Sequence, residues 1–191
     1  VDLRQHRELI AEARVLLLQM EIPRETVFEA LRLGRECGLT TILNPAPAAP
    51  LPSDLLRLVD ILTPNESEAQ VLTGSADPAE AARILTDRGV GTVVVTCGAN
   101  GAFLTTGNDV THIPGFLVET IDSTGAGDAF NGALACAVAE GVPIKSAIVR
   151  ANAAGALATT GRGAQESMPT KDDIEQLCRS GVRQMEPRQR S

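Results

Sequence analysis

The chain has 191 residues, enough to bury a core in one or at most two small domains without disulfide or metal cross-links. Its formal net charge is −7, which argues against a protein that binds nucleic acid through clustered positive charge. The aromatic residues are four Phe, with no Trp or Tyr, so the stacking platform of single-strand binders is missing. No run of 18 or more apolar residues occurs and the N-terminal stretch is polar, so the sequence predicts neither a membrane span nor a signal peptide.

The cysteines and histidines predict no metal or disulfide framework. The four cysteines are far apart in the sequence, and we expect buried, reduced thiols in a cytoplasmic protein. They are Cys37, Cys97, Cys136 and Cys178. His6 and His112 are also far apart, which argues against a histidine triad or a two-histidine metal site.

Short apolar runs alternate with amphipathic segments through the first half of the chain. Apolar runs predict strands at 14–19, 39–43, 60–62 and 92–96. Apolar periodicity, with proline at several starts and glycine at several ends, predicts helices at 23–37, 54–59, 64–72 and 78–89. Four prolines make 44–52 a loop.

Two short motifs predict how two of these helices begin. Residues 63–66 (TPNE) read as a capping box with Thr63 as the cap and Pro64 at the first helical position. Residues 77–80 (DPAE) repeat the same device with Asp77 as the cap.

The second half predicts further short strands and then helices. Strands are expected at 102–105, 110–113 and 116–121, and helices at 125–140, 144–160 and 171–178, the last capped by Thr170. Strand–helix alternation through Gly89 predicts one α/β domain over residues 1–191, with a parallel sheet and helices on both faces.

The segment 122–128 (DSTGAGD) carries the most chemistry. It joins a strand-like run to a helix that begins near Gly125, and its glycines leave backbone N–H groups uncovered where the helix dipole is positive. Asp128 falls in the first helical turn beside this anion site, where an ionised carboxylate can accept a proton from an attacking hydroxyl. A plain turn followed by an ordinary acidic first turn is the alternative.

Three other segments allow a functional and a structural reading. Asn65 and Glu68, three apart on a helix, could hold a hydrated Mg²⁺ or form only an acidic, capped first turn. The glycine-rich turn 96–101 could approach a nucleotide at the carboxyl end of a strand, or be a plain β-turn. The carbonyls of 158–167, with Asp122, could cage a monovalent cation, or the segment could be a glycine-rich helix exit. Walker-type, G-x-G-x-x-G and G-x-S-x-G motifs do not occur.

Together these segments resemble the ribokinase family of sugar kinases, the phosphofructokinase-B superfamily, over about residues 16–177. The most specific match is DSTGAGDAFNGAL at 122–134, supported by the N-x-x-E motif in LTPNESEAQVLTG at 62–74. LLLQMEIP at 16–23, ILNPAPA at 42–48 and the run at 151–170 agree with it. The resemblance implies a three-layer α/β fold, a mostly parallel sheet flanked by helices with a short antiparallel strand region after Thr96.

The resemblance also implies roles for individual residues. Asp128 matches the catalytic base, and Gly125, Ala126 and Gly127 match the anion hole for the transferred phosphoryl group. Glu68 matches the residue that holds Mg²⁺ through water, and Glu21 a residue that binds the sugar. The expected nucleotide-binding residues are Asn65, Thr96, Cys97, Gly98, Ala99, Asn100, Gly101, Gly127, Asp128 and Asn152. The expected K⁺ ligands are Asp122, Thr124, Ala158, Gly161, Gly163 and Ser167, although Glu166 stands where the family usually has proline.

The implied reaction is ATP-dependent phosphorylation of D-ribose to ribose 5-phosphate, with Mg²⁺ and K⁺ and with no nucleic acid or membrane partner. The family's N-terminal glycine-pair motif and β-sheet lid have no match before Leu16, so we expect a C-terminal portion that is weak or inactive by itself, from a longer protein able to form a homodimer. The alternatives are a fructokinase, ketodeoxygluconate kinase or nucleoside kinase of the same superfamily, or a nucleotide-binding module without catalysis. A dinucleotide oxidoreductase fits the alternation but lacks its fingerprint.

Overall fold

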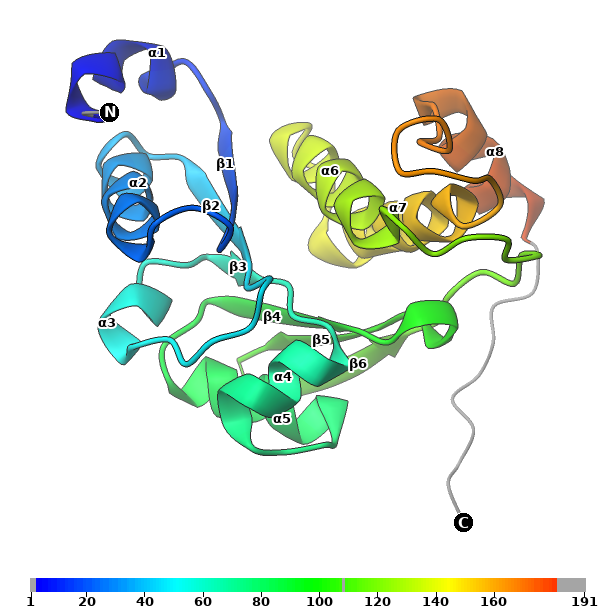
Figure 1. The fold of residues 1–191 in the computed structure, drawn as a ribbon, viewed down its shortest axis with the longest axis horizontal. Coiled ribbons are helices and arrows are strands. Elements are labelled where there is room, and N and C mark those ends of the chain that lie inside the picture. The colour runs from blue at the N-terminus through cyan, green and yellow to red at the C-terminus, as the bar shows by residue number, and fades with distance from the viewer. Residues whose placement is uncertain (1–2, 108, 182–191) are drawn as a thin grey trace. The chain divides into compact units, whose positions relative to one another are not determined.

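A computed structural model describes residues 3–107 and 109–181 of the chain (Figure 1). The chain divides into two compact units. Unit 1 runs up to Thr96 and includes Phe103–Thr111, and unit 2 comprises Cys97–Ala102 and the residues from His112 onward. The expectation of one domain over 1–191 stays a prediction.

A six-stranded sheet follows the chain order from one edge to the other. Its strands are β1 (Val15–Gln19), β2 (Thr40–Asn44), β3 (Ile61–Leu62), β4 (Thr92–Thr96), β5 (Ala102–Thr106) and β6 (Asp109–Ile113). The first four pair in parallel, with Leu17 beside Ile42 and Leu43 beside Leu62. Only residues 107 and 108 join β5 to β6, a connection that requires an antiparallel pair. A mostly parallel α/β sheet flanked by helices, with antiparallel strands after Thr96, is therefore confirmed.

The central strands form because their residues are apolar on both sides. Ile42, Leu43 and the three valines of β4 are fully buried, which is typical of parallel strands covered on both faces. β1 is the edge strand, and Leu17 on it is half-exposed. The apolar runs in the sequence therefore identified the strands that lie deepest in the sheet.

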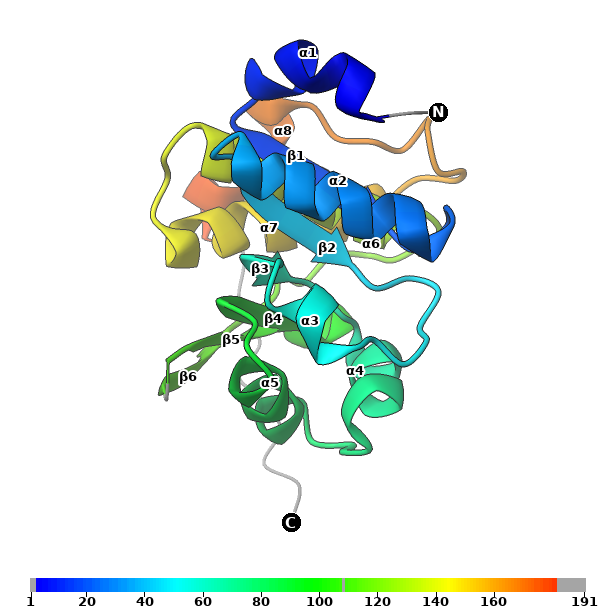
Figure 2. The same ribbon diagram turned by 90° about the vertical axis from the view of Figure 1, so that its left-hand side faces the viewer.

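In unit 1, α1 (Arg7–Ala11) follows a short 3-10 turn at Leu3–His6 and precedes β1. The helices that connect the parallel strands are α2 (Arg24–Glu36), α3 (Ser53–Leu56), α4 (Glu66–Thr73) and α5 (Pro78–Asp87). Figure 2 shows α2 lying along β1 and β2, where it buries Val27, Leu31 and Leu33. Gly34 allows this close approach, because a Cβ there would lie 2.8 Å from Leu16 Cδ2. α5 packs against β4 in the same unit.

The predicted capping box at 63–66 is wrong by two residues. The cap is Asn65, its partner is Glu68, and Pro64 lies outside the helix. The reason is tertiary: the Thr63 backbone N–H donates to Leu43 O at 3.0 Å, and Thr96 N donates to Pro64 O at 2.9 Å, so the chain continues β3 through these residues. At α5 the Asp77 cap and Pro78 are confirmed, but Glu80 accepts from the Ser75 hydroxyl instead of completing a box.

Unit 2 is a layer of three helices, α6 (Ala126–Ala139), α7 (Ile144–Ala158) and α8 (Lys171–Ser180), with a 3-10 turn at Gly98–Asn100. Small side chains line the α6–α7 contact, and a Cβ on Gly155 would lie 3.3 Å from Ala126 O. Helix α8 packs on α7, and Thr170 caps it in a capping box with Asp173, which confirms the predicted cap.

The strand predicted at 116–121 is wrong, since the structure has no strand there. Phe116 is buried, but Leu117 and Ile121 are 52% and 58% exposed. Phe116 forms a single β-bridge, and Ile121 N donates to Thr159 O at 2.7 Å, so the run ends against α7 instead of continuing as a strand.

The predicted burial of the four cysteines holds fully only for Cys97. Cys136 is exposed on α6, and Cys37 and Cys178 are half-buried. Within residues 3–107 and 109–181, no helix is both long and apolar enough to cross a bilayer.

Candidate functional site

Polar residues line up where the parallel strands of unit 1 end. Gln19 ends β1, Asn44 ends β2, and Thr96 ends β4. The Asn44 side-chain amide donates to Thr63 O at 3.0 Å, and a parallel bridge sets Asn65 beside Thr96. The carboxyl ends of parallel strands are where ligands bind in open α/β sheets. Two predicted nucleotide-binding residues, Asn65 and Thr96, are therefore neighbours at this edge.

Asn65 and Glu68 form a reciprocal capping box at the start of α4. The Asn65 side-chain oxygen accepts from Glu68 N at 2.8 Å, and Asn65 N donates to Glu68 Oε2 at 2.9 Å. The Asn65 amide nitrogen also donates to Glu68 Oε1 at 2.9 Å. Glu68 is only 9% exposed, and this burial raises its pKa, against the opposing effect of the Asn65 backbone hydrogen bond.

These contacts decide how Glu68 could serve a divalent cation. Both carboxylate oxygens already accept hydrogen bonds from Asn65, so a direct metal bond would compete with the helix cap. Each oxygen has a second lone pair, and Mg²⁺ keeps most of its water ligands in proteins. The arrangement fits a carboxylate that orients a metal-bound water.

Glu21 is exposed in the loop that follows β1. The neighbouring Met20 N donates to Ala46 O at 2.9 Å, which ties this loop to the segment after β2. Glu21 is thus at the same strand edge of unit 1 as Asn65, although the structure records no hydrogen bond or ion pair between them.

The start of α6 has the geometry of an anion site in unit 2. Gly125 caps the helix with φ +80°, a conformation that favours glycine, and a Cβ there would lie 3.2 Å from Ala164. A Cβ on Gly127 would meet open space. The N–H groups of a first helical turn have no acceptor within the helix, and the dipole there is positive. The predicted helix start and its uncovered glycine are confirmed.

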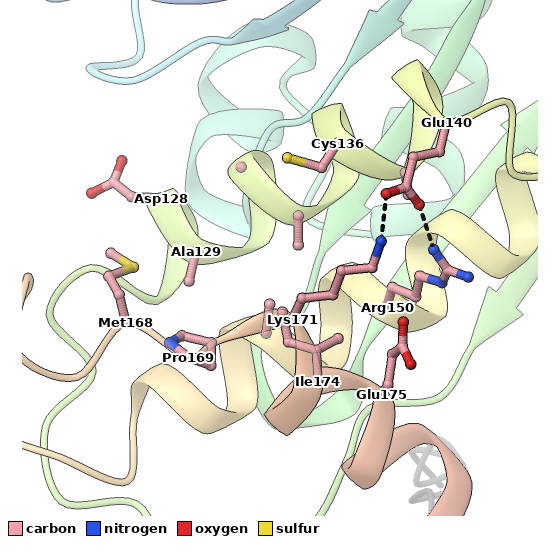
Figure 3. A pocket seen from close by; sticks show the side chains of 14 residues that line it. Asp128, Ala129, Cys136, Glu140, Arg150, Met168, Pro169, Lys171, Ile174 and Glu175 are labelled. Carbon is pink, nitrogen blue, oxygen red and sulfur yellow. Dashed lines mark hydrogen bonds and ion pairs between the residues drawn. The ribbon is translucent and has the colours of Figure 1, made fainter.

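Asp128 is exposed in the first turn of α6. Figure 3 shows its carboxylate extending from the helix start, away from the ion pairs at the far end of α6. Those ion pairs centre on Glu140, which accepts from Lys171 Nζ at 2.7 Å and from Arg150 at 3.0 Å. Both hydrogen bonds lower the pKa of Glu140, that from Lys171 more. Between Asp128 and Glu140 runs a groove lined by alanines of α6 and α7 and by Met168, Pro169 and Ile174.

Asp122 ties the predicted cation residues together in unit 2. One carboxylate oxygen accepts from the Thr124 N–H at 3.0 Å and from the Thr124 hydroxyl at 2.7 Å, and the other accepts from Gly163 N at 3.2 Å. These bonds, the Thr124 backbone first, lower the pKa of Asp122. The Ser167 hydroxyl donates to Gly163 O, and a Cβ on Gly161 would lie 2.9 Å from Ser167 Cβ. Ala158 is fully buried at the end of α7.

This donor set is rich in carbonyl oxygens and carries one carboxylate. Among the described residues, no group of three or more His, Cys, Asp or Glu is arranged to hold a metal ion. A ring of backbone carbonyls replaces the hydration shell of K⁺ in known selective sites. The residues therefore fit a monovalent cation better than a transition metal, which takes nitrogen and sulfur ligands.

The turn 97–101 rests directly on the backbone of residues 113–115, within unit 2. Cys97 N donates to Gly101 O at 2.7 Å and closes the turn. A Cβ on Gly101 would overlap Ile113 O, and a Cβ on Gly115 would overlap Ala99 O. His112 Nε2 lies 2.7 Å from Asn100 O, a contact in which the ring nitrogen must donate.

Asn152 supports this arrangement from α7. It is 7% exposed, and its side-chain amide donates to Ile113 O at 3.2 Å and to Pro114 O at 3.1 Å. Sequence reasoning named Asn152 but missed His112 and Gly115. The close approach of Gly115 to Gly101 is visible only in three dimensions. The predicted site residues thus form three connected groups: 65–68 with Thr96, 97–101 with Asn152, and 122–127 with 161–167.

Comparison with known proteins agrees with this geometry. A family model described as pfkB family carbohydrate kinase matches residues 2–171. Ribokinase of Haemophilus influenzae is 41% identical over 175 residues, which are 89% of this chain and 57% of that protein. Deoxyribokinase of Salmonella typhi is 35% identical over 175 residues, 88% of this chain and 57% of that protein. The chain therefore spans a little over half the length of these relatives.

Solved structures give the same answer for the fold. A ribokinase from Thermotoga maritima superposes with a TM-score of 0.84 at 34% identity, covering 94% of this chain and 60% of that one. Arabidopsis thaliana ribokinase, solved with ribose and ATP, gives a TM-score of 0.83 at 31% identity, covering 91% and 58%.

Proposed function

Because the chain belongs to the pfkB family of carbohydrate kinases, we propose that it is part of an ATP-dependent sugar kinase that converts D-ribose to ribose 5-phosphate. The similarity to ribokinases over most of the chain supports the reaction class and the substrate. Because the chain spans 57% of the Haemophilus influenzae relative, the activity proposed is that of the protein to which this chain contributes.

The observation that carries the proposal is the start of α6. An exposed carboxylate, Asp128, stands one residue after a glycine whose Cβ position is open, at the positive end of a helix of 14 residues. We assign Asp128 Oδ as the group that takes the proton from the attacking sugar hydroxyl. The backbone N–H groups of Gly125 and Gly127 then donate hydrogen bonds toward charge that develops on the transferred phosphoryl group. The Ala126 N–H is the third group of this anion hole, and it would exchange its present acceptor, Ser123 O at 3.2 Å, for the phosphoryl oxygen.

Two cations are assigned to two separate groups of residues, one in each unit. Mg²⁺, when bound, neutralises charge on the nucleotide phosphates, and Glu68 would orient one of its waters. Asp122 and Thr124, with the 158–167 loop, would hold K⁺, and the carbonyls of Ala158, Gly161 and Gly163 with Ser167 supply the oxygen donors. Gly125 packs on Ala164 of this loop, so the loop supports the start of α6.

The remaining residues are assigned to the two substrates. Asn65 and the turn 96–101 would contact ATP, and Glu21 would contact the ribose hydroxyls. The adjacency of Asn65 and Thr96 at one strand edge supports the first assignment. The requirement for K⁺ and a homodimer of the longer protein stay predictions.

The test is ribose-dependent ADP formation by the product of the complete gene, with and without Mg²⁺ and K⁺. We expect turnover with ribose that needs Mg²⁺ and rises with K⁺. Turnover that is independent of any sugar, or ATP binding without turnover, would contradict a kinase and favour the nucleotide-binding module.

A different sugar is the second candidate, favoured by the 35% identity to a deoxyribokinase. The same assay run with 2-deoxyribose and fructose beside ribose decides between them. A kcat/KM for either sugar above that for ribose would replace ribose as the substrate while leaving the reaction class unchanged.

A further inference from the structure

We propose that Glu140, at the end of α6, is a positioning residue for the 158–167 loop: through its ion pair with Lys171 it fixes the start of α8, to which this loop leads. The inference deepens the proposed cation site, so its effect on K⁺ rests on the proposed function. Its structural part rests only on contacts within unit 2.

The first step is that Glu140 joins three helices. It is the C-cap residue of α6, and its two carboxylate oxygens accept hydrogen bonds from two other helices (Figure 3). Oε1 accepts from Lys171 Nζ, at the first residue of α8, at 2.7 Å, and Oε2 accepts from Arg150 Nη1 of α7 at 3.0 Å. The hydrogen bond between Glu140 and Lys171 lowers the pKa of the carboxyl and raises the pKa of the amine, so both groups stay charged at neutral pH.

The second step is that α8 lies on the surface of α7 rather than in a core. No side chain of α8 is fully buried, and Ile174 packs, partly buried, against alanines of α6 and α7. The capping box of Thr170 and Asp173 is local to the start of α8. Because residues three apart share one face of a helix, Lys171 and Ile174 hold the same side of α8 toward α6 and α7. The ion pair with Glu140 is therefore a main contact at the start of α8.

The third step concerns how the two ends of the 158–167 loop are held. At the α7 end, Ile121 N and Asp122 N both donate to Thr159 O, at 2.7 and 3.1 Å. At the α8 end, Met168 N donates to Gln165 O at 3.3 Å, a bond inside the segment that leads to α8. The first end is thus tied to another part of unit 2, whereas the second end follows the position of α8.

This difference matters because the residues proposed as K⁺ ligands lie along the whole loop. The Gly163 carbonyl oxygen accepts from the Ser167 hydroxyl, and Gly163 N donates to Asp122. A ring of oxygen donors binds a cation more tightly when the ring is already formed, since binding then orders less of the chain. Fixing the α8 end through Glu140 should keep Ser167 beside Gly163.

The sign of the effect separates positioning from direct attraction of the cation. If the two groups acted on K⁺ only through their charge, removing the Glu140 carboxylate would weaken K⁺ binding and removing the Lys171 ammonium would strengthen it. If they act by holding α8, removing either group weakens K⁺ binding. Both side chains are partly exposed, and an exposed ion pair contributes little. We therefore expect the K⁺ concentration at half-saturation to rise by about two- to fivefold.

The experiment compares Glu140→Gln, Lys171→Met and the double variant with the unchanged chain. K⁺ is titrated at constant ionic strength, with tetramethylammonium chloride making up the balance, because salt alone screens the ion pair. K⁺ binding is followed by the NMR shift of the Gly163 amide signal. Hydrogen exchange is measured without K⁺ at the amides of Gly163, Met168 and Ile174, each of which donates a hydrogen bond in the loop or at the start of α8.

Arg179→Met is the matched control. Arg179 forms an ion pair of 2.8 Å with Glu175, but both residues lie on α8. This variant removes one positive charge from α8, as Lys171→Met does, without breaking a link to α6. The amide of Cys97, which donates to Gly101 O in the same unit, reports whether the whole of unit 2 has loosened.

Both single variants should exchange faster at the three amides and bind K⁺ about two- to fivefold more weakly, with exchange at Cys97 unchanged. The double variant should be close to Glu140→Gln, because both single substitutions break the same link. Arg179→Met should match the unchanged chain in both readouts.

Unchanged exchange at Gly163 and Met168 would overturn the inference, even if Ile174 exchanges faster, since α8 would then loosen without its loop. Stronger K⁺ binding by Lys171→Met would also overturn it and assign the effect to charge alone. If the unchanged chain binds no K⁺, the proposed cation site loses its support, and exchange at these amides still decides whether Glu140 positions the loop.

Discussion

Asn65 and Glu68 are joined reciprocally at the start of α4 by three hydrogen bonds of 2.8–2.9 Å. The Asn65 backbone N–H donates to one carboxylate oxygen of Glu68, and the Asn65 side-chain amide donates to the other. Glu68 N in turn donates to Asn65 Oδ1. A buried carboxylate is thereby kept in one orientation, with the exposed Asn65 beside Thr96.

Glu68→Gln should change the pH dependence of stability. Burial raises the pKa of Glu68, so the folded chain holds this proton to higher pH than the unfolded chain. The contribution of Glu68 to the free energy of unfolding therefore falls as pH rises from its ordinary pKa through the raised one. The free energy of unfolding of the variant should therefore lack this decrease with pH. Urea unfolding from about pH 4 to about pH 8 measures the difference.

Glu66→Gln is the control for this prediction, because Glu66 is exposed in the same turn. It should follow the unchanged chain at every pH. If the Glu68 variant also follows it, the carboxylate does not titrate differently on folding.

Asp128→Asn should remove catalysis and leave the fold intact. The substitution keeps the size of an exposed side chain but removes the proton acceptor, so kcat should fall by about 10²–10⁴-fold. Nucleotide affinity and the melting temperature should change little. Asp172→Asn, an exposed carboxylate in the first turn of α8, controls for the lost helix-dipole interaction and should retain full kcat.

Gly125→Ala and Gly127→Ala should separate folding from chemistry. At Gly125 a Cβ meets φ +80° and Ala164, so alanine should cost about 1–2 kcal/mol or more in the free energy of unfolding. At Gly127 the Cβ meets open space in a helix, and alanine should raise stability by about 0.5–1 kcal/mol.

The same Gly127→Ala protein should nevertheless turn over more slowly, since its methyl group would stand before the N–H groups assigned to the phosphoryl oxygens. Chemical denaturation and kcat measured on one preparation give both numbers. Equal kcat in this variant would remove the start of α6 from the proposed mechanism.

Thr105→Val should stabilise unit 1. The Thr105 hydroxyl in β5 is fully buried, and the described residues offer it no hydrogen-bond partner. Replacing it by a methyl group of the same shape removes a desolvation cost of about 1–3 kcal/mol. Thr41→Val is the opposite case, since that hydroxyl donates to Leu58 O, and it should destabilise in the same urea titration.

Local signals predicted most of the fold. The valines of β4, the apolar stripe of α2 and the Thr170 cap act within a few residues, and the structure confirms each. The errors arose where distant partners decide. Thr63 continues a strand because it bonds to Leu43, 20 residues away, and Ile121 bonds to Thr159 rather than to a strand.

The site shows the same division. The glycine cap and the acidic first turn of α6 follow from their local spacing and were predicted. The hydrogen bond from Gly163 N to Asp122 spans 41 residues, and those from Asn152 to the 113–114 carbonyls span 39 and 38. No local periodicity encodes such pairs, so these contacts are visible only in the folded chain.

The backbone contact between Gly101 and Gly115 limits how freely this chain can diversify. Both positions reject any added carbon, whatever its polarity, because the obstacle is main chain and cannot rotate away. Gly38 has a similar φ of +78° but an open surrounding, so asparagine can replace it at modest cost. A randomised library would return glycine alone at 101 and 115, and a mixture of glycine and asparagine at 38.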